Sequence, residues 1–162
     1  MIFSVWAPNA KSVDLVLGAH RFALERLTDG YWQGDVAADT RLGYRYSIDG
    51  SAPVPDPRSR WQPEGVHGAS HVIESAAPQA RSRVHREFHA VPLSEAIIYE
   101  LHLGTFTPEG TYAAAQVKLA HLAELGVTHL ELMPLATFPG RRGWGYDGVD
   151  LFAPFPAYGT PT

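Results

Sequence analysis

The sequence predicts a β-sandwich at residues 1–90, followed by the start of an α/β domain at residues 91–162. Apolar and polar residues alternate with a period of two in the first half, as in strands that have one buried face. Prolines and polar residues interrupt this pattern, and the second half then changes to a helical period. A chain of 162 residues has room for one domain and part of another.

The first half is predicted to form short strands of an immunoglobulin-like β-sandwich. Residues 12–17 and 44–49 alternate apolar with polar side chains, and Phe22 and Leu24 repeat the pattern. Several short strands separated by turns are typical of a sandwich. The turn signals are Pro8-Asn9-Ala10, Thr28-Asp29-Gly30 and Asp49-Gly50.

Residues 53–68 have a different composition, with three prolines between Pro55 and Pro63 and little periodicity. Each proline removes a hydrogen-bond donor and fixes φ, so we expect an ordered, extended loop rather than a helix. Residues 75–92 are polar and carry two further prolines. We place the linker between the two predicted domains there.

The second half is predicted to form a strand–helix–strand unit. Residues 97–101 are a nearly continuous apolar run, typical of a strand covered on both faces. Residues 112–125 predict one helix, with Thr111 as its N-cap and Gly126 just after its end. Residues 127–133 return to strand. The apolar stripe of the helix is Tyr112, Ala115, Leu119 and Leu122.

Composition excludes several classes of function. The formal net charge is −4 and no basic block is present, which argues against nucleic-acid binding. The absence of cysteine excludes disulfides and thiolate metal sites. The first residues lack a signal-peptide pattern, and no apolar run approaches the ~20 residues of a membrane span, so we expect a cytoplasmic protein. No cofactor is predicted.

The loop that follows the strand at 127–133 is the best candidate for a binding site. It carries Trp144, Tyr146 and Asp147 among three glycines, and ligands of parallel α/β domains bind at the carboxyl ends of strands. An aromatic ring packs against the C–H face of a sugar, and a carboxylate accepts hydrogen bonds from sugar hydroxyls. The alternative is that the aromatic side chains only form a small core beneath the loop.

These residues resemble the malto-oligosyltrehalose trehalohydrolases of the α-amylase superfamily. The segment Ile98-Tyr99-Glu100-Leu101-His102-Leu103-Gly104-Thr105-Phe106-Thr107-Pro108-Glu109-Gly110-Thr111-Tyr112 is similar to the first barrel strand and loop of that family. The segment Glu131-Leu132-Met133-Pro134 and the loop from Gly140 to Gly148 are similar to the second. Residues 3–10 and 55–68 resemble its sandwich and the following segment. Branching enzymes, on the same fold, typically carry Gln after Trp-Gly-Tyr, where this chain has Asp147.

The resemblance implies that residues 91–162 begin a (β/α)₈ TIM barrel that this chain leaves incomplete. It implies a retaining glycosidase that releases trehalose from maltooligosyltrehalose, with two carboxyl groups about 5–5.5 Å apart. In the family these carboxyl groups follow later barrel strands, so this chain carries no catalytic residue and is expected to be inactive alone. Tyr146 matches the tyrosine that stacks under the sugar at the −1 subsite. Asp147 and Trp144 are further candidates for contacting that sugar.

Other polar and aromatic residues have two interpretations. Glu100 and His102 share one face of a predicted strand. They are either an acid–base pair or structural polar residues of a barrel. His85 and His89 are four residues apart, but their motif is not that of a zinc site, and we predict no metal site. The tryptophans of the first half also have two interpretations, either glucan binding or packing in the core; they are Trp6, Trp32 and Trp61.

The leading interpretation is therefore that the chain is part of a trehalohydrolase that acts on maltooligosyltrehalose or a related α-glucan. One alternative is part of a 1,4-α-glucan branching enzyme. Another is a glucan-binding module without catalysis. The sequence does not indicate whether the protein is a monomer or an oligomer.

Overall fold

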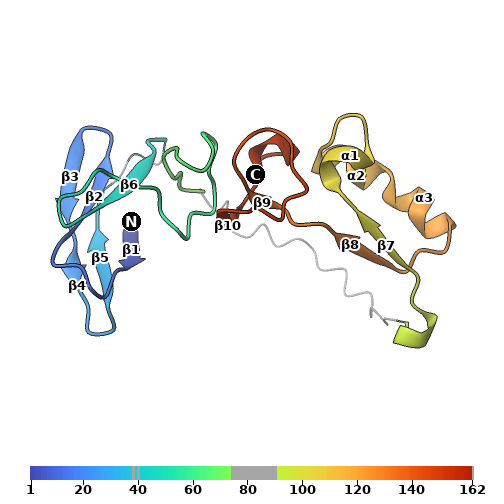
Figure 1. Cartoon of the computed structure of the whole chain (residues 1–162), viewed down its shortest axis with the longest axis horizontal. Helices are drawn as coiled ribbons and strands as arrows, with labels where there is room; N and C mark the ends of the chain where they lie inside the picture. Colours follow the sequence, from blue (N-terminus) through green and yellow to red (C-terminus); the bar gives the residue numbers. More distant parts are fainter. Residues whose placement is uncertain (38, 40, 74–90, 162) are drawn as a thin grey trace.

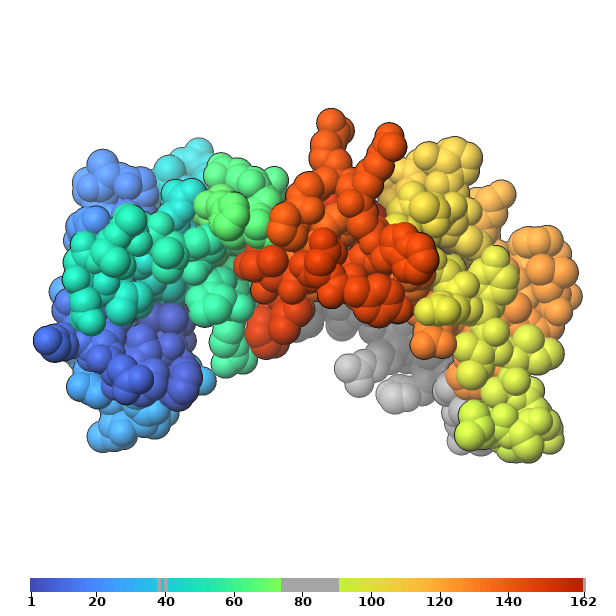
Figure 2. Space-filling view, viewed as in Figure 1, coloured from blue at the N-terminus to red at the C-terminus, as the bar shows by residue number. Residues whose placement is uncertain are grey.

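The computed structural model describes residues 1–37, 39, 41–73 and 91–161. The chain forms an elongated arrangement, with the sandwich strands at one end and a parallel strand pair with its helices at the other (Figure 1). The C-terminal segment, red in both views, lies between these two parts (Figure 2). The predicted linker at 75–92 falls almost entirely outside the described residues, so the division at residue 90 stays a prediction.

The predicted β-sandwich is confirmed and consists of two three-stranded antiparallel sheets. One sheet has the order β1-β5-β4 and the other has the order β3-β2-β6. The strands of the first sheet are β1 (Ile2–Trp6), β4 (Glu25–Arg26) and β5 (Tyr31–Asp35). Those of the second are β2 (Val13–Leu17), β3 (His20–Ala23) and β6 (Tyr44–Ile48).

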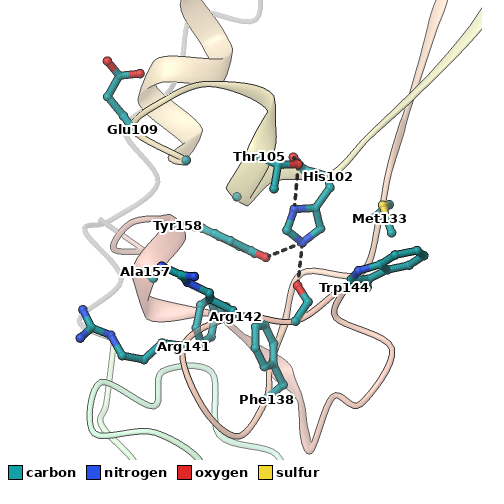
Figure 3. Close-up of a pocket in the computed structure, with 14 residues that line it drawn as sticks. His102, Thr105, Glu109, Met133, Phe138, Arg141, Arg142, Trp144, Ala157 and Tyr158 are labelled. Carbon is teal, nitrogen blue, oxygen red and sulfur yellow. Dashed lines mark hydrogen bonds between the residues drawn. The ribbon is translucent and has the colours of Figure 1, made fainter.

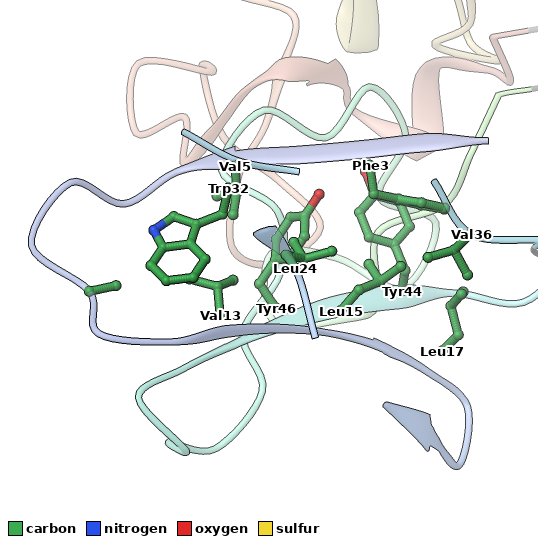
Figure 4. Packing of buried hydrophobic residues seen from close by; sticks show 11 residues of the cluster. Phe3, Val5, Val13, Leu15, Leu17, Leu24, Trp32, Val36, Tyr44 and Tyr46 are labelled. Atoms are coloured by element: carbon green, nitrogen blue, oxygen red, sulfur yellow. The ribbon is translucent and has the colours of Figure 1, made fainter. Parts of the chain in front are cut away.

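Alternating side chains of both sheets point inward and form one core (Figure 4). Leu15 of β2 and Tyr46 of β6 are at most 1% exposed. Phe3 of β1 meets the ring of Tyr44 edge to face, with ring centroids 5.1 Å apart. The period of two in the sequence therefore identified the buried face of β2 and, in β6, the inward positions of Tyr44 and Tyr46, whereas Ser47 on the other face of β6 is also buried.

The turn at Asp49-Gly50 is fixed by its backbone and by hydrogen bonds. Both residues have positive φ, which glycine adopts freely and aspartate tolerates better than most residues. The Asp49 carboxylate accepts hydrogen bonds from the backbone N–H groups of Lys11 and Ser12, at 2.7 and 2.9 Å. These contacts depress the pKa of Asp49 and connect this turn to the start of β2.

The proline-rich segment forms the expected ordered loop. Val54 of this segment pairs with Tyr46 of β6, and Ser70, just after the segment, pairs with Tyr44. Asp56 is buried and accepts a hydrogen bond of 2.7 Å from the hydroxyl of Tyr44. Burial and the Asp56 carboxylate together raise the pKa of Tyr44, so this hydroxyl remains a proton donor. The loop is thus anchored to the sandwich.

The second half contains the predicted strand–helix–strand unit, with a parallel pair of strands. Strands β7 (Ile98–Leu101) and β8 (His129–Leu132) pair in parallel, with Ile98 opposite His129. The intervening helices are α1 (Leu103–Phe106), α2 (Tyr112–Val117) and α3 (Leu119–Glu124), and the 3₁₀ turn η1 (Leu93–Glu95) precedes β7.

The single helix predicted for residues 112–125 is divided in two at Lys118. The backbone of Lys118 has ψ of −8°, and its N–H bonds to the carbonyl of Ala115, three residues earlier, as in a 3₁₀ turn. The predicted ends are confirmed. Thr111 accepts a hydrogen bond from the N–H of Ala114, and Gly126 has φ of +89°.

The prediction that the first parallel strand is covered on both faces was wrong. Ile98 is 55% exposed and Tyr99 is 39% exposed, and Leu130 and Leu132 of β8 are similarly exposed. Among the described residues, β7 and β8 have only each other as strand partners, and the helices leave part of this two-stranded sheet uncovered. The apolar residues fit a buried parallel sheet, but the described chain does not bury them.

A small antiparallel pair and a second core occupy the middle of the molecule. Strand β9 (Ala136–Thr137) pairs with β10 (Asp150–Pro154), and the 3₁₀ turn η2 (Pro156–Tyr158) follows. Phe138 and Phe155 stack with ring centroids 4.2 Å apart, and Tyr158 meets Phe155 edge to face. This core joins β7 and the helices to the C-terminal segment, and its other buried members are Leu101, Leu103 and Ala115.

Candidate functional site

A cleft of about 940 Å³ opens at the carboxyl ends of β7 and β8 (Figure 3). Its walls come from the residues after β7, from the loop after β8 and from η2. This is the place where parallel α/β folds bind ligands. The polar and aromatic side chains that line it are His102, Thr105, Glu109, Phe138, Arg141, Arg142, Trp144, Phe155 and Tyr158.

His102 holds the walls of the cleft together. Its Nε2 lies 2.9 Å from the carbonyl oxygen of Gly143 and 3.2 Å from the hydroxyl of Tyr158. Its Nδ1 lies 3.3 Å from Oγ1 of Thr105. A carbonyl only accepts, so the bond to Gly143 places the proton on Nε2 and leaves Nδ1 to accept from Thr105. One imidazole thereby joins three segments of the chain (Figure 3).

Two glycines permit this close packing. At Gly145, φ is +89° and a Cβ would collide with the carbonyl oxygen of Pro134. At Gly104, a Cβ would come within 2.9 Å of the Tyr158 ring and 3.0 Å of the His102 ring. Side chains at these positions would therefore push the loop and η2 away from His102.

The structure distinguishes among the three predicted substrate-binding residues. Trp144 lines the cleft and is 75% exposed, so its ring is available to a ligand. Tyr146 is 69% exposed on the same loop, and Asp147 is also exposed, but neither lines the cleft. The alternative of a small core beneath the loop does not describe Trp144 or Tyr146, because both rings remain largely exposed.

The role of Tyr158 was not predicted, and of the two interpretations of His102 the structure favours that of a structural polar residue. Tyr158 is buried against Tyr112 and Phe155, with its hydroxyl at the cleft. Glu100 is exposed and does not line the cleft, so no acid–base pair forms there. The pairing of His102 with Tyr158 joins positions 56 residues apart, which local pattern could not reveal. The histidines at 85 and 89 lie outside the described residues.

The three tryptophans of the first half differ in exposure. Trp32 is buried in the sandwich core, and its indole N–H donates to the carbonyl of Ala7 at 3.0 Å. Trp61 is half-buried, whereas Trp6 is 59% exposed. Of the three, only Trp6 therefore offers a largely open ring.

Asp150, the first residue of β10, is a buried carboxylate. It is 5% exposed, and its Oδ2 has no hydrogen-bond partner among the described residues. Desolvation by burial raises the pKa of Asp150, and Asp56 adds to this effect while His67 opposes it. Burying a carboxylate with an unpaired oxygen costs stability when the group is ionised.

We expect the substitution Asp150→Asn to stabilise the chain at neutral pH. Because the native pKa of Asp150 lies above its ordinary value of 3.8, ionisation favours the unfolded state as pH rises above about 4. The gain in unfolding free energy should therefore be present at about pH 7 and largely absent at about pH 3. Urea unfolding at both pH values measures it, with the exposed Asp147→Asn as control. An equal gain at both values would contradict this account.

Comparison with known proteins relates the whole chain to one group of enzymes. The chain is 44% identical over 167 residues to the malto-oligosyltrehalose trehalohydrolase of Saccharolobus solfataricus, and 39% identical over 159 residues to that of Deinococcus radiodurans. These matches cover 99% and 98% of this chain. The chain is homologous to part of the malto-oligosyltrehalose trehalohydrolases. It spans 28% and 26% of the length of these two relatives.

A solved structure and a further relative also match nearly the whole chain. A crystal structure described as a putative α-amylase from Salmonella typhimurium superposes with a TM-score of 0.85 and 43% identity, covering 99% of this chain and 27% of that one. A branching enzyme of Streptomyces avermitilis is 34% identical over 98% of this chain, which is 21% of its own length. No family model matches the chain.

The described residues contain neither a membrane-spanning helix nor a cluster of metal ligands. None of the helices in the part of the chain that the structure describes has the length and apolarity needed to cross a membrane. Within the same residues, no three or more His, Asp or Glu side chains gather as a metal site.

Proposed function

We propose that this chain is part of a retaining glycoside hydrolase that releases trehalose from maltooligosyltrehalose by cleaving the adjacent α-1,4 bond. The observation that carries the proposal is that seven relatives named malto-oligosyltrehalose trehalohydrolase are 38–44% identical to this chain over at least 98% of its length. The cleft at the carboxyl ends of β7 and β8 supports it, because that is where such a fold binds its substrate.

In this proposal the chain supplies one wall of the sugar-binding cleft. Trp144 offers an open ring to the cleft, and Arg141 and Arg142 line the same cleft, where their guanidinium groups donate hydrogen bonds to sugar hydroxyls. Tyr146 stacks under the sugar at the −1 subsite, and Asp147 contacts the same sugar. Since both lie beside the cleft rather than on its lining, a bound sugar would extend across the rim of the loop 140–148.

A branching enzyme is the second candidate. It is favoured by the Streptomyces avermitilis relative, but the identity of 34% is lower than for every trehalohydrolase named above. A pullulanase from Anoxybacillus, crystallised with maltotetraose, superposes with a TM-score of 0.76 and 26% identity over 97% of this chain and 28% of its own. This likeness favours an α-glucan ligand under either candidate.

The two candidates differ in their product. We expect a longer protein that carries this chain, and spans its relatives' full length, to release free trehalose from maltooligosyltrehalose and to form no α-1,6 branches. Tyr146→Ala should slow release without changing the product. The 162-residue chain alone should release no trehalose, because the family's carboxylates follow later strands. Trehalose release by this chain alone, or branches from the longer protein, would contradict the proposal.

A further inference from the structure

A second cleft, of about 520 Å³, adjoins the first. It lies between the turn at residues 63–67, which belongs to the loop anchored on the sandwich, and the segments at 138–141 and 155–157. The two clefts share four residues, which form a common wall: Phe138, Arg141, Phe155 and Ala157. In Figure 3, the pale green trace of the sandwich-side loop passes beside Arg141.

The common wall is rigid at its base and polar at its rim. Phe138 and Phe155 are buried and stacked at 4.2 Å, so they fix the position of both clefts relative to each other. Arg141 is exposed above them and lines both clefts. A ligand that spanned both clefts would therefore cross the exposed side chain of Arg141.

The opposite wall carries polar groups held in place by the turn. The Glu64 carboxylate accepts a hydrogen bond of 3.4 Å from the N–H of Ala69, and its Cβ packs against Gly68. His67 is exposed on the same turn. Glu64, His67 and Arg141 provide donors and acceptors for hydroxyl groups, and the proline rings at 63, 139 and 156 provide flat apolar surface. This combination suits a pyranose ring.

We propose that the second cleft is an outer subsite for an α-1,4-linked glucan whose terminal units occupy the first cleft. The proposal rests on the proposed function, since it extends the same ligand. It assigns the turn at residues 63–67 to glucan binding, so the sandwich side of the molecule contributes to selection of chain length. Glu64 and His67 are the residues that contact the added units.

The experiment is a calorimetric titration of the full 162-residue chain with maltose through maltoheptaose. We expect affinity to rise as the first cleft fills, and then to rise about tenfold further as longer chains reach the second cleft. The double variant Glu64→Gln, His67→Ala should lose this further gain and keep the affinity for short chains. The introduced glutamine side chain retains an acceptor for the N–H of Ala69, so the turn is preserved. His121→Ala, at an exposed histidine of α3, is the control.

The outcomes separate this inference from the proposed function. If wild-type chain binds no malto-oligosaccharide of any length, the subsite is overturned, whereas the proposed function is overturned only by the product test on the longer protein. If it binds them with an affinity that does not grow for the longer chains, or if the double variant retains the gain, the subsite alone is overturned. As a second readout, only the longer oligosaccharides should shift the amide resonances of Gly65 and Gly140, which line the second cleft.

Discussion

The substitution Leu15→Ala is expected to reduce the free energy of unfolding of the sandwich by about 2–5 kcal/mol. Leu15 has no exposed surface and lies in the core between the two sheets (Figure 4). Removal of its side chain loses buried apolar contacts and leaves a cavity that paired strands cannot collapse to fill. Urea unfolding followed by tryptophan fluorescence measures the loss, because Trp32 is buried in the same core.

Leu27→Ala is the matched control for this experiment. Leu27 lies between the strands β4 and β5 and is 41% exposed, so we expect a change within about 0.5 kcal/mol. Equal losses for the two variants would mean that the sandwich core does not determine the stability of this part of the chain.

The substitution His102→Ala is expected to free the loop at residues 140–148. It removes the bond to the Gly143 carbonyl and the contacts to Tyr158 and Thr105. At roughly 0.5–1.5 kcal/mol for each hydrogen bond, the loss is about 2 kcal/mol, equivalent to about 30-fold faster amide exchange in the loop. Hydrogen exchange measured by mass spectrometry tests this, and weaker malto-oligosaccharide binding should accompany it.

Tyr158→Phe separates the hydrogen bond from the packing. The phenylalanine ring keeps the contacts with Phe155 and Tyr112 but loses the hydroxyl near Nε2. We expect a small increase in exchange, because the bond between His102 and Gly143 remains. Unchanged protection of the loop in His102→Ala would show that other contacts position it.

Regular patterns and special backbone positions allowed much of the fold to be predicted. Strands β2 and β6 follow the alternation that the sequence shows, and the N-cap at Thr111 follows from a single hydroxyl. Strands β1 and β5 were not identified by alternation. In β1 the exposed positions include Ile2 and Trp6, and β5 contains Gly34, so neither segment shows a clear polar face.

The cleft and one of its lining residues could be located from the sequence, but the parts of its lining that are distant in sequence could not. Trp144 follows a strand end, and a local rule about loops of parallel sheets identified it. Tyr158 and the turn at residues 63–67 are far from that loop in sequence and reach the clefts through tertiary packing. The apolar run of β7 predicted a strand covered on both faces, but such a run does not specify which neighbours are present to cover it.

The contacts of Arg58 depend on the shape of its side chain as well as on its charge. Its guanidinium lies over the ring of Phe152 on β10, 5.3 Å from the centroid, and one of its nitrogens is 3.5 Å from the hydroxyl of Tyr31 on β5. A planar cation lies flat on an aromatic ring and donates along its edge at the same time, which a lysine ammonium does not do. The shape of the side chain, rather than its charge, therefore limits which substitutions this position accepts, and a change to lysine is not conservative there.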